Sequence, residues 1–357
     1  MTDTEEEEVP DEYVTATSPA FLLAILCRVF LLTYTVVSVM MWQTKKGAGT
    51  MAAAKRRKRF VIIAIIIAVL LIVTAAFAFF GAGYSLNIRR QTLEEARTWQ
   101  ENHYDLSWYD PLEKTDYTIT SYDGYVLHAQ YLQNPDQSSK YIIISHGYSD
   151  NRFGALKYAK MYLDFGFNVI VYDLRGHGLN EQTFCTYSAR ERKDLLAMIQ
   201  DSRQRWPDMT LFGLHGESLG AATSIAVLED KPPVDFVVAD CGFSEIVNVL
   251  KNGMQAMHLP DFLTEIMSIG AKVRFGYSYN DMRPIDSLKD NRIPILFIHG
   301  GSDSFVLPEN SEKMKEATQG YAELHLIPNV DHAMSIISEP DRYREIVSAF
   351  LEKIMDQ

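Results

Sequence analysis

The segment Gly216-Glu217-Ser218-Leu219-Gly220 constrains the fold of this chain more than any other. An apolar run at 210–215 leads into it and small and apolar residues follow at 221–228, so the pattern predicts a strand, a sharp turn and a helix. Such a turn strains the backbone of Ser218 and exposes its hydroxyl, and a Cβ at either flanking glycine would collide with a neighbouring strand or helix. The alternative is an ordinary surface turn, so the interpretation depends on the rest of the chain.

Strand and helix patterns alternate across most of the chain. Short apolar runs predict strands at 117–122, 125–132, 141–145, 168–172, 210–214, 236–239, 294–298 and 322–327. Helical patterns lie between them near 153–165, 190–204, 219–229, 308–318 and 340–355. The first two strands flank Asp123-Gly124, which indicates a two-residue hairpin, and the later ones have the continuous apolar character of strands buried on both faces. This alternation predicts an α/β fold with helices on both faces of a parallel sheet.

The interval 243–293 is too long for a simple crossover between two strands. Its apolar content predicts two or three helices that form a small cap over the sheet edge. Met254, Met257 and Met267 would suit an adaptable apolar wall, because methionine is flexible. The alternative is that they simply pack the cap onto the body of the domain.

Three polar residues follow three predicted strands in an order that suggests nucleophilic catalysis. Ser218 comes after the strand at 210–214, Asp303 after the strand at 294–298, and His332 after the last strand. Functional groups of open α/β sheets gather at the carboxyl ends of the strands. A serine hydroxyl needs a base to act as nucleophile, and the base needs an orienting acid. The sequence therefore predicts a Ser218, His332 and Asp303 triad.

Two other residues compete for roles in this site, and two backbone groups complete it. His325 is a second histidine late in the chain, but it lies inside the last strand, which favours a structural role. Asp331 is a rival acid, but its adjacency to His332 makes their side-chain geometry poor. We expect the N–H groups of Leu219, at a helix start, and of Tyr148, after the strand at 141–145, to form the oxyanion hole.

Charge and cysteine content exclude several classes of protein. The net charge of −12 argues against a nucleic-acid partner, because phosphate binding needs clustered Lys and Arg. The three cysteines, Cys27, Cys185 and Cys241, include no C-x-x-C pair, so neither a zinc site nor a thioredoxin-like motif is expected. Cys185 and Cys241 could pair or stay separate thiols. No metal or organic cofactor is implied.

An uncharged apolar run at 60–80 predicts a membrane anchor over 60–82. At about 1.5 Å per residue the run spans about 31 Å, which matches a bilayer core. The basic cluster within 43–59 indicates that this side is cytoplasmic and that the catalytic body lies outside. A second apolar stretch at 20–42, interrupted by Arg28, is a possible further span, and it follows an acidic, disordered tail at 1–19. Residues 83–116 form a polar connector.

Two alternatives to this anchor stay open. Ala76-Phe77-Ala78 could be a signal-peptide cleavage site. Met51-Ala52-Ala53-Ala54-Lys55 resembles the start of a signal anchor, so translation could begin at Met51 rather than at residue 1.

These residues together resemble the α/β-hydrolase family. The resemblance rests on His146-Gly147, the run Tyr172-Asp173-Leu174-Arg175-Gly176-His177-Gly178, the Ser218 elbow, His299-Gly300 with Asp303, and Asp331-His332-Ala333. The chain is most similar to a bacterial, membrane-anchored branch of esterase- and peptidase-like members. The resemblance implies an eight-stranded, mostly parallel sheet over 117–357 with a helical cap at about 244–290. One departure is Asn180, where many relatives carry Ser; we interpret that run as structural.

The predicted function is that of a membrane-anchored serine hydrolase that cleaves carboxylic esters. The apolar cap favours small-molecule or lipid-like esters. An amidase, a peptidase or an acyltransferase would use the same triad, and a non-catalytic surface-binding protein is the alternative from another class. A dehalogenase-like hydrolase is disfavoured because its nucleophile is a carboxylate, whereas this elbow carries Ser218.

Overall fold

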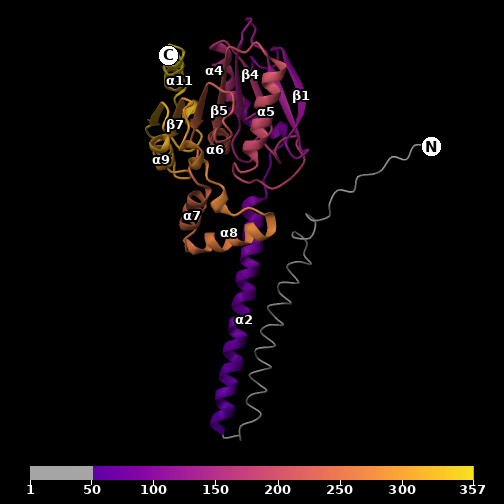
Figure 1. Ribbon diagram of the computed structural model, residues 1–357, viewed down its shortest axis with the longest axis vertical. Coiled ribbons are helices and arrows are strands. Elements are labelled where there is room, and N and C mark those ends of the chain that lie inside the picture. Colours follow the sequence, from indigo (N-terminus) through magenta and orange to yellow (C-terminus); the bar gives the residue numbers. More distant parts are fainter. Residues whose placement is uncertain (1–50, 357) are drawn as a thin grey trace, which may run out of the picture. The chain divides into compact units, whose positions relative to one another are not determined.

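The computed structural model describes residues 51–356 (Figure 1). The predicted tail at 1–19, the possible span at 20–42 and Cys27 lie outside the described residues. The described chain divides into two compact units. One contains the chain up to Tyr84 together with Glu265–Ser278, and the other contains Ser85–Thr264 and the chain from Tyr279 onward.

The second unit is built on one eight-stranded sheet with the order β1-β2-β4-β3-β5-β6-β7-β8. The strands are β1 (Lys114–Thr120), β2 (Val126–Leu132), β3 (Lys140–Ser145), β4 (Phe167–Tyr172), β5 (Leu211–Glu217), β6 (Phe236–Asp240), β7 (Ile295–Gly300) and β8 (Ala322–Ile327). Only β2 breaks the parallel arrangement, by pairing antiparallel with both β1 and β4. The predicted α/β fold with a mostly parallel sheet is therefore confirmed.

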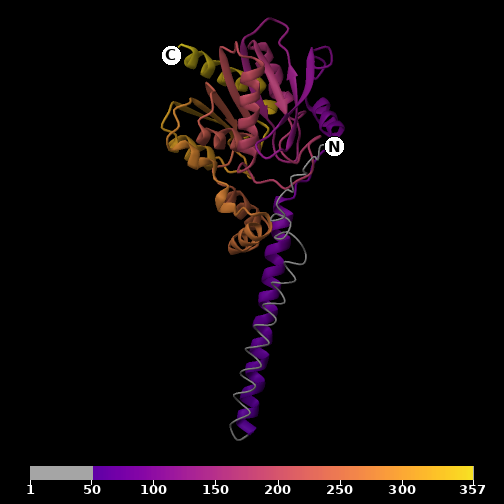
Figure 2. The same ribbon diagram turned by 45° about the vertical axis from the view of Figure 1, so that its right-hand side comes forward.

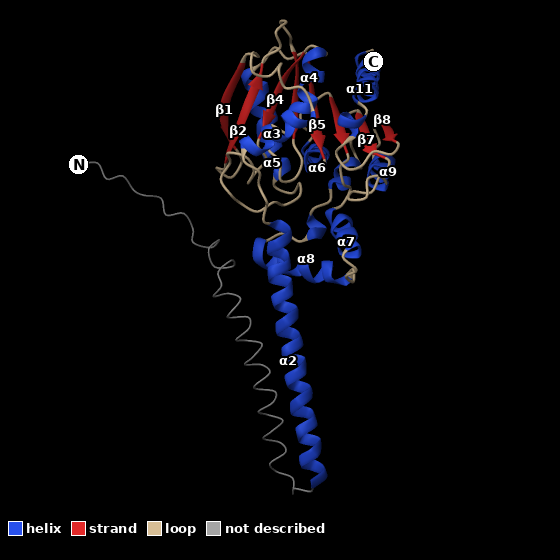
Figure 3. Cartoon of the chain, turned by 180° about the vertical axis from the view of Figure 1, so that it is seen from behind, coloured by secondary structure: helices blue, strands red, loops and turns tan. Residues whose placement is uncertain are grey.

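Helices cover both faces of the sheet (Figure 3). They are α3 (Leu93–His103), α4 (Leu156–Asp164), α5 (Glu191–Arg205), α6 (Leu219–Ala226) with the 3-10 turn η2 (Val227–Asp230), α9 (Glu309–Ala317), α10 (Ser335–Ser338) and α11 (Pro340–Met355). Apolar residues of α4 and α11 pack against alternate residues of β3, β4, β6 and β7 in one buried cluster. The chain ends at α11, the yellow helix beside the C label in Figure 2.

The pattern of burial explains why these strands form. Every residue of β4 and β7 is buried, so an uninterrupted apolar run is required there. The edge strand β1 is mostly exposed or half-buried and carries polar residues instead. The loop between β1 and β2 is longer than the predicted two-residue hairpin, because β1 ends at Thr120 and β2 begins only at Val126. Within the loop, Ser121 N–H donates to the Tyr125 carbonyl (2.8 Å), and Gly124 takes the turn with φ 83°.

The interval between β6 and β7 contains α7 (Ile246–Ala256), α8 (Phe262–Phe275) and the 3-10 turns η3 (Tyr279–Asp281) and η4 (Pro284–Leu288). The predicted helices are therefore present. Residues 265–278 belong to the first unit, so the placement of a cap over the sheet edge stays a prediction.

The first unit is dominated by α2 (Met51–Leu86), which is longer at both ends than the predicted anchor. Among the described residues, one helix, Lys55–Leu86 within α2, is long and apolar enough to cross a membrane.

Candidate active site

Ser218 sits at a strained turn between β5 and α6. Its backbone has φ 52° and ψ −108°, a conformation that residues with a side chain rarely adopt. A Cβ on Gly216 would lie 2.2 Å from the Gly220 carbonyl oxygen, and one on Gly220 would lie 2.1 Å from the Ser145 carbonyl oxygen. The structure therefore confirms that only glycine fits on both sides of Ser218.

Three residues from separate strand ends meet at Ser218. His332 Nε2 lies 3.0 Å from Ser218 Oγ, and His332 Nδ1 lies 2.6 Å from Asp303 Oδ2. Because the carboxylate can only accept, Nδ1 carries the imidazole proton and Nε2 is free to accept one from the serine. The structure thus brings all three predicted residues together in the order that proton transfer requires.

Asp303 is held in place from several directions. Its Oδ1 accepts hydrogen bonds from the N–H groups of Phe305 (3.0 Å) and Val306 (2.9 Å). Burial opposes the charged form, but hydrogen bonds from His299 and His332 lower the pKa of Asp303 well below its ordinary value. Asp303 is therefore an ionised acceptor for the imidazole.

His299, which the sequence analysis names only within the family resemblance, supports Asp303. Its Nε2 lies 3.1 Å from Asp303 Oδ2 and 2.7 Å from the Val306 carbonyl, so that nitrogen carries the proton. Its Nδ1 then accepts from Ser311 Oγ at 2.7 Å. The sequence feature that could have indicated this role is the position of His299 at the end of β7, four residues before Asp303.

The rival residues take other roles. His325 Nε2 pairs with Glu323 on the same strand, at 3.0 Å. Asp331 Oδ1 accepts the backbone N–H of His332 (2.8 Å) rather than its imidazole. Both findings agree with the preference for Asp303 and His332.

The expected oxyanion donors follow two neighbouring strands, β5 and β3. Leu219 is buried and begins α6, and Tyr148 follows β3 in the loop that contains Gly147. The Tyr148 ring stacks on Tyr187 with ring centroids 5.7 Å apart. The assignment of their N–H groups to an oxyanion hole stays a prediction.

A buried ionic cluster lies directly behind the nucleophile. Lys157 of α4 forms an ion pair with Glu217, the residue before Ser218, and both side chains are less than a tenth exposed. Tyr158 Oη lies within hydrogen-bond distance of both Glu217 Oε2 (2.7 Å) and Asp240 Oδ2 (2.9 Å). Burial raises the pKa of Asp240 to about 6, and burial likewise raises that of Asp150 to about 6.

This cluster touches two further segments of the site. A Cβ on Gly147 would lie 2.9 Å from Glu217 Oε1, so the predicted oxyanion loop packs directly on that carboxylate. Lys157 Nζ lies 3.5 Å from the carbonyl of Ala333, next to His332. The sequence analysis missed this arrangement, because a lysine on a helix and a glutamate in the elbow show no sign of being partners until the fold is known.

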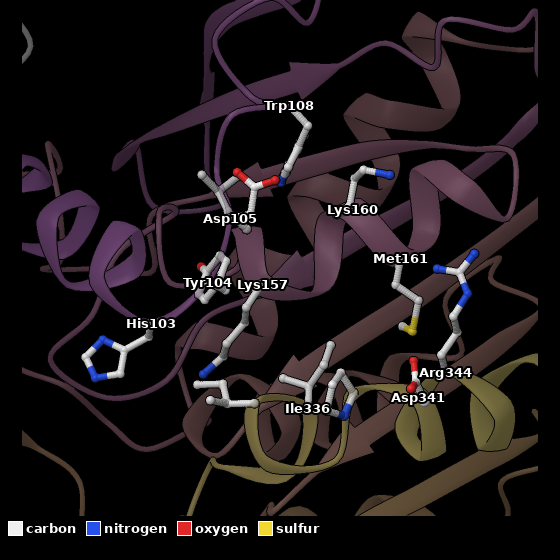
Figure 4. Close-up of a pocket in the computed structure, with 13 residues that line it drawn as sticks. His103, Tyr104, Asp105, Trp108, Lys157, Lys160, Met161, Ile336, Asp341 and Arg344 are labelled. Atoms are coloured by element: carbon white, nitrogen blue, oxygen red, sulfur yellow. The ribbon is translucent and has the colours of Figure 1, made fainter.

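Lys157 also lines a cavity of about 380 Å³ (Figure 4). Lys157, Lys160 and Met161 of α4 line it opposite Ile336 of α10 and Arg344 of α11, and none of the triad residues does. It is therefore distinct from the site at Ser218. Within 51–356, no group of His, Cys, Asp and Glu residues has the arrangement of a metal site.

The run that follows β4 braces loops, as its interpretation as structural implies. Arg175 is buried and pairs with Asp194 and Asp123. Asn180 is buried, and its side chain bonds the Asp173 carbonyl at 2.6 Å. Cys185 and Cys241 are both buried and free, so the two do not pair.

Comparisons with known proteins agree with this geometry. The model of the prolyl oligopeptidase family matches residues 155–357. The uncharacterized protein YqkD of Bacillus subtilis is 31% identical over 277 residues, which are 76% of this chain and 90% of that protein.

Two solved structures share the fold. An esterase of Pyrococcus furiosus, PF2001, has a TM-score of 0.60 at 22% identity, covering 75% of this chain and 98% of its own. Est1E from Butyrivibrio proteoclasticus, solved with ferulic acid, has a TM-score of 0.56 at 17% identity, covering 68% of this chain and 100% of its own. At these identities the likeness establishes the α/β-hydrolase fold and nothing about substrate.

Proposed function

Given that the chain belongs to the prolyl oligopeptidase family of α/β-hydrolases, we propose that it is a serine hydrolase that cleaves carboxylic esters. The observation that carries the proposal is the continuous path from Ser218 Oγ through His332 to Asp303, with contacts of 3.0 Å and 2.6 Å. Each contact lies in the range needed for proton transfer in nucleophilic catalysis.

The reaction proceeds in two acyl transfers. Ser218 Oγ attacks the carbonyl carbon while its proton moves to His332 Nε2, and the N–H groups of Leu219 and Tyr148 stabilise the oxyanion. The C–O bond to the leaving alkoxide then breaks, and that oxygen takes the proton from His332. Water attacks the acyl-enzyme and gives a proton to His332, which returns it to Ser218 as the acid leaves. Asp303 holds the imidazole throughout and stabilises its cationic form.

The surroundings of His332 support an apolar substrate. The ring of Phe305 lies 5.2 Å from the imidazole, measured between centroids, and its side chain is 56% exposed. An exposed aromatic ring beside the base is a contact surface for the apolar part of an ester. Small-molecule or lipid-like esters are therefore the proposed substrates.

Peptide and amide bonds are the second candidate substrate class, and family membership is what favours them. The chemistry is the same with a harder leaving group. We further propose that α2 anchors the enzyme in the cell membrane, with the basic cluster at its start on the cytoplasmic side and the catalytic unit outside. The apolar length of Lys55–Leu86 supports this.

The test is a pair of substrates with one acyl group, a p-nitrophenyl ester and the matching p-nitroanilide, given to the full-length protein in detergent. We expect ester turnover that Ser218→Ala abolishes. Ser224→Ala is the matched control, because Ser224 is a buried serine of α6 whose hydroxyl has no hydrogen-bond partner within 51–356. Anilide hydrolysis at a comparable kcat/KM would favour the peptidase alternative, and ester turnover that survives Ser218→Ala would overturn the proposal.

A further inference from the structure

The carboxyl-terminal end of α2 has the features of a membrane boundary. Ile66, Leu70 and Val73 each expose half or more of their side chains along the apolar part of the helix. Phe80 is 66% exposed and Tyr84 is 87% exposed, one turn apart on the same side of the helix. Aromatic side chains gather where a spanning helix leaves the bilayer, so the boundary falls near these two residues.

Helix α8 crosses α2 at this same level, as Figures 1 and 2 both show. A Cβ on Gly270 would lie 2.1 Å from the carbonyl oxygen of Ala78, so the two backbones are in direct contact there. Met267 packs over Gly81 in the same way, with its Cγ 2.8 Å from where a Cβ would be. Small residues let helices approach this closely in membranes as well as in water.

The guanidinium of Arg274 contributes further contacts between α8 and α2. Arg274 Nη1 donates to the Phe79 carbonyl at 3.0 Å, and its guanidinium lies 4.3 Å from the centre of the Phe79 ring. A Cβ on Gly83 would also lie 2.2 Å from Arg274 Nη1, so the contacts from Ala78 to Gly83 extend over about 8 Å of the axis of α2. Helix α8 is therefore fixed to the last turns of the apolar helix.

Other residues of α8 carry apolar side chains that this packing leaves uncovered. Ile269 is 66% exposed and Val273 is 43% exposed, and their spacing of four places them on one face of the helix. Gly270 and Met267, by contrast, contact α2. Ile269 and Val273 are therefore an exposed aliphatic pair on α8, flanked on the same helix by the exposed charged residues Glu265 and Lys272.

We propose that residues 265–275 of α8 lie on the membrane surface, with Ile269 and Val273 inserted among the lipid acyl chains. The bilayer is thus the partner that covers Ile269 and Val273. The inference rests on the proposed membrane anchoring of α2, and it adds that a segment of the interval between β6 and β7 docks on the same membrane. An amphipathic helix in this position buries its apolar face about 5–10 Å into the headgroup boundary.

The test uses full-length protein in lipid vesicles with one labelled cysteine at a time. In a Cys27→Ser background, Cys185 and Cys241 are buried, so a bimane label reports on Ile269→Cys or Val273→Cys. Ile66→Cys is the control within the proposed span, and Ala349→Cys is the control on an exposed position of α11. Each variant is compared in vesicles with and without lipids that carry a nitroxide on the acyl chain.

We expect about threefold quenching at positions 269, 273 and 66 and none at 349, since only a label within the acyl region meets the nitroxide. If the label at position 66 is quenched but the labels at 269 and 273 are quenched no more than the label at 349, the docking of α8 is overturned. The proposal that α2 spans the membrane would still hold. Absence of quenching at 66 as well would overturn both. Retained esterase activity of each labelled variant shows that the fold is unchanged.

Discussion

Replacing Lys157 with methionine tests whether the ionic cluster behind Ser218 holds the active site together. The Lys157 and Glu217 side chains are 6% and 7% exposed, so both charges are largely shielded from solvent. Removing one partner of a buried ion pair leaves the other charge uncompensated, which costs about 3–5 kcal/mol of unfolding free energy. Lys157 also lowers the pKa values of Asp150 and Asp240, both near 6, so these carboxyls will titrate at still higher pH in the variant.

The assay is urea unfolding of the detergent-solubilised protein, followed by tryptophan fluorescence. Lys160→Met is the matched control, because Lys160 lies on the same helix and pairs with Asp164 at the surface, where an ion pair contributes at most about 1 kcal/mol. The double variant Lys157→Met with Glu217→Gln removes both charges. Its loss of unfolding free energy should be about 2 kcal/mol smaller than the sum of the losses in the two single variants. A loss below about 1 kcal/mol for Lys157→Met, with additive single and double variants, would refute the reasoning.

Three further predictions follow from the site. Asp303→Asn should lower kcat for ester hydrolysis by about 10⁴-fold, because the imidazole loses the acceptor that sets its tautomer, and steady-state kinetics of the folded variant checks this. It should also lower the urea midpoint, because the fold loses an ionised carboxylate whose hydrogen bonds hold its pKa well below the ordinary value. Gly216→Ala should cost about 3 kcal/mol in the same unfolding assay, since its Cβ would meet the Gly220 backbone; an unchanged midpoint would contradict the turn geometry. Asp240 has a folded-state pKa of about 6 against an ordinary value of 3.8, so its ionisation destabilises the fold as pH rises through 6. The unfolding free energy of Asp240→Asn should therefore rise by about 3 kcal/mol relative to that of wild type between pH 4 and pH 8. A difference between the two proteins that does not change with pH would argue against this.

The triad could be predicted because the position of its residues depends on the sheet topology. Parallel strands end at one edge of the sheet, so residues that follow β5, β7 and β8 must meet there whatever lies between them. The preference for Asp303 over Asp331 rested on side-chain geometry, and the hydrogen bonds of both residues agree with it.

The supporting residues could not be predicted, because their contacts depend on how helices pack on the sheet. Lys157 reaches Glu217, the last residue of β5, only once α4 has packed on the sheet, and nothing in the spacing of the two residues indicates this. The loop at Asp123-Gly124 is longer than its local turn signal predicts, and Asp123 also pairs with Arg175, a tertiary contact that this signal does not contain.

The packing of α8 on α2 was also beyond the sequence. Gly270 and Ala78 are far apart in the chain, and small residues of this kind occur in many helices without contacting one another. The alternatives for Cys185 and Cys241 stayed open for a similar reason, since pairing depends on distance and not on count.

The most direct test of the central claim is labelling of the intact protein with a fluorophosphonate probe, which reacts only with an activated serine. We predict that wild type and Ser224→Ala are labelled and that Ser218→Ala is not, because the His332 contact at 3.0 Å activates Ser218 alone. Labelling that persists in folded Ser218→Ala, or a folded wild type that does not react, would contradict the account.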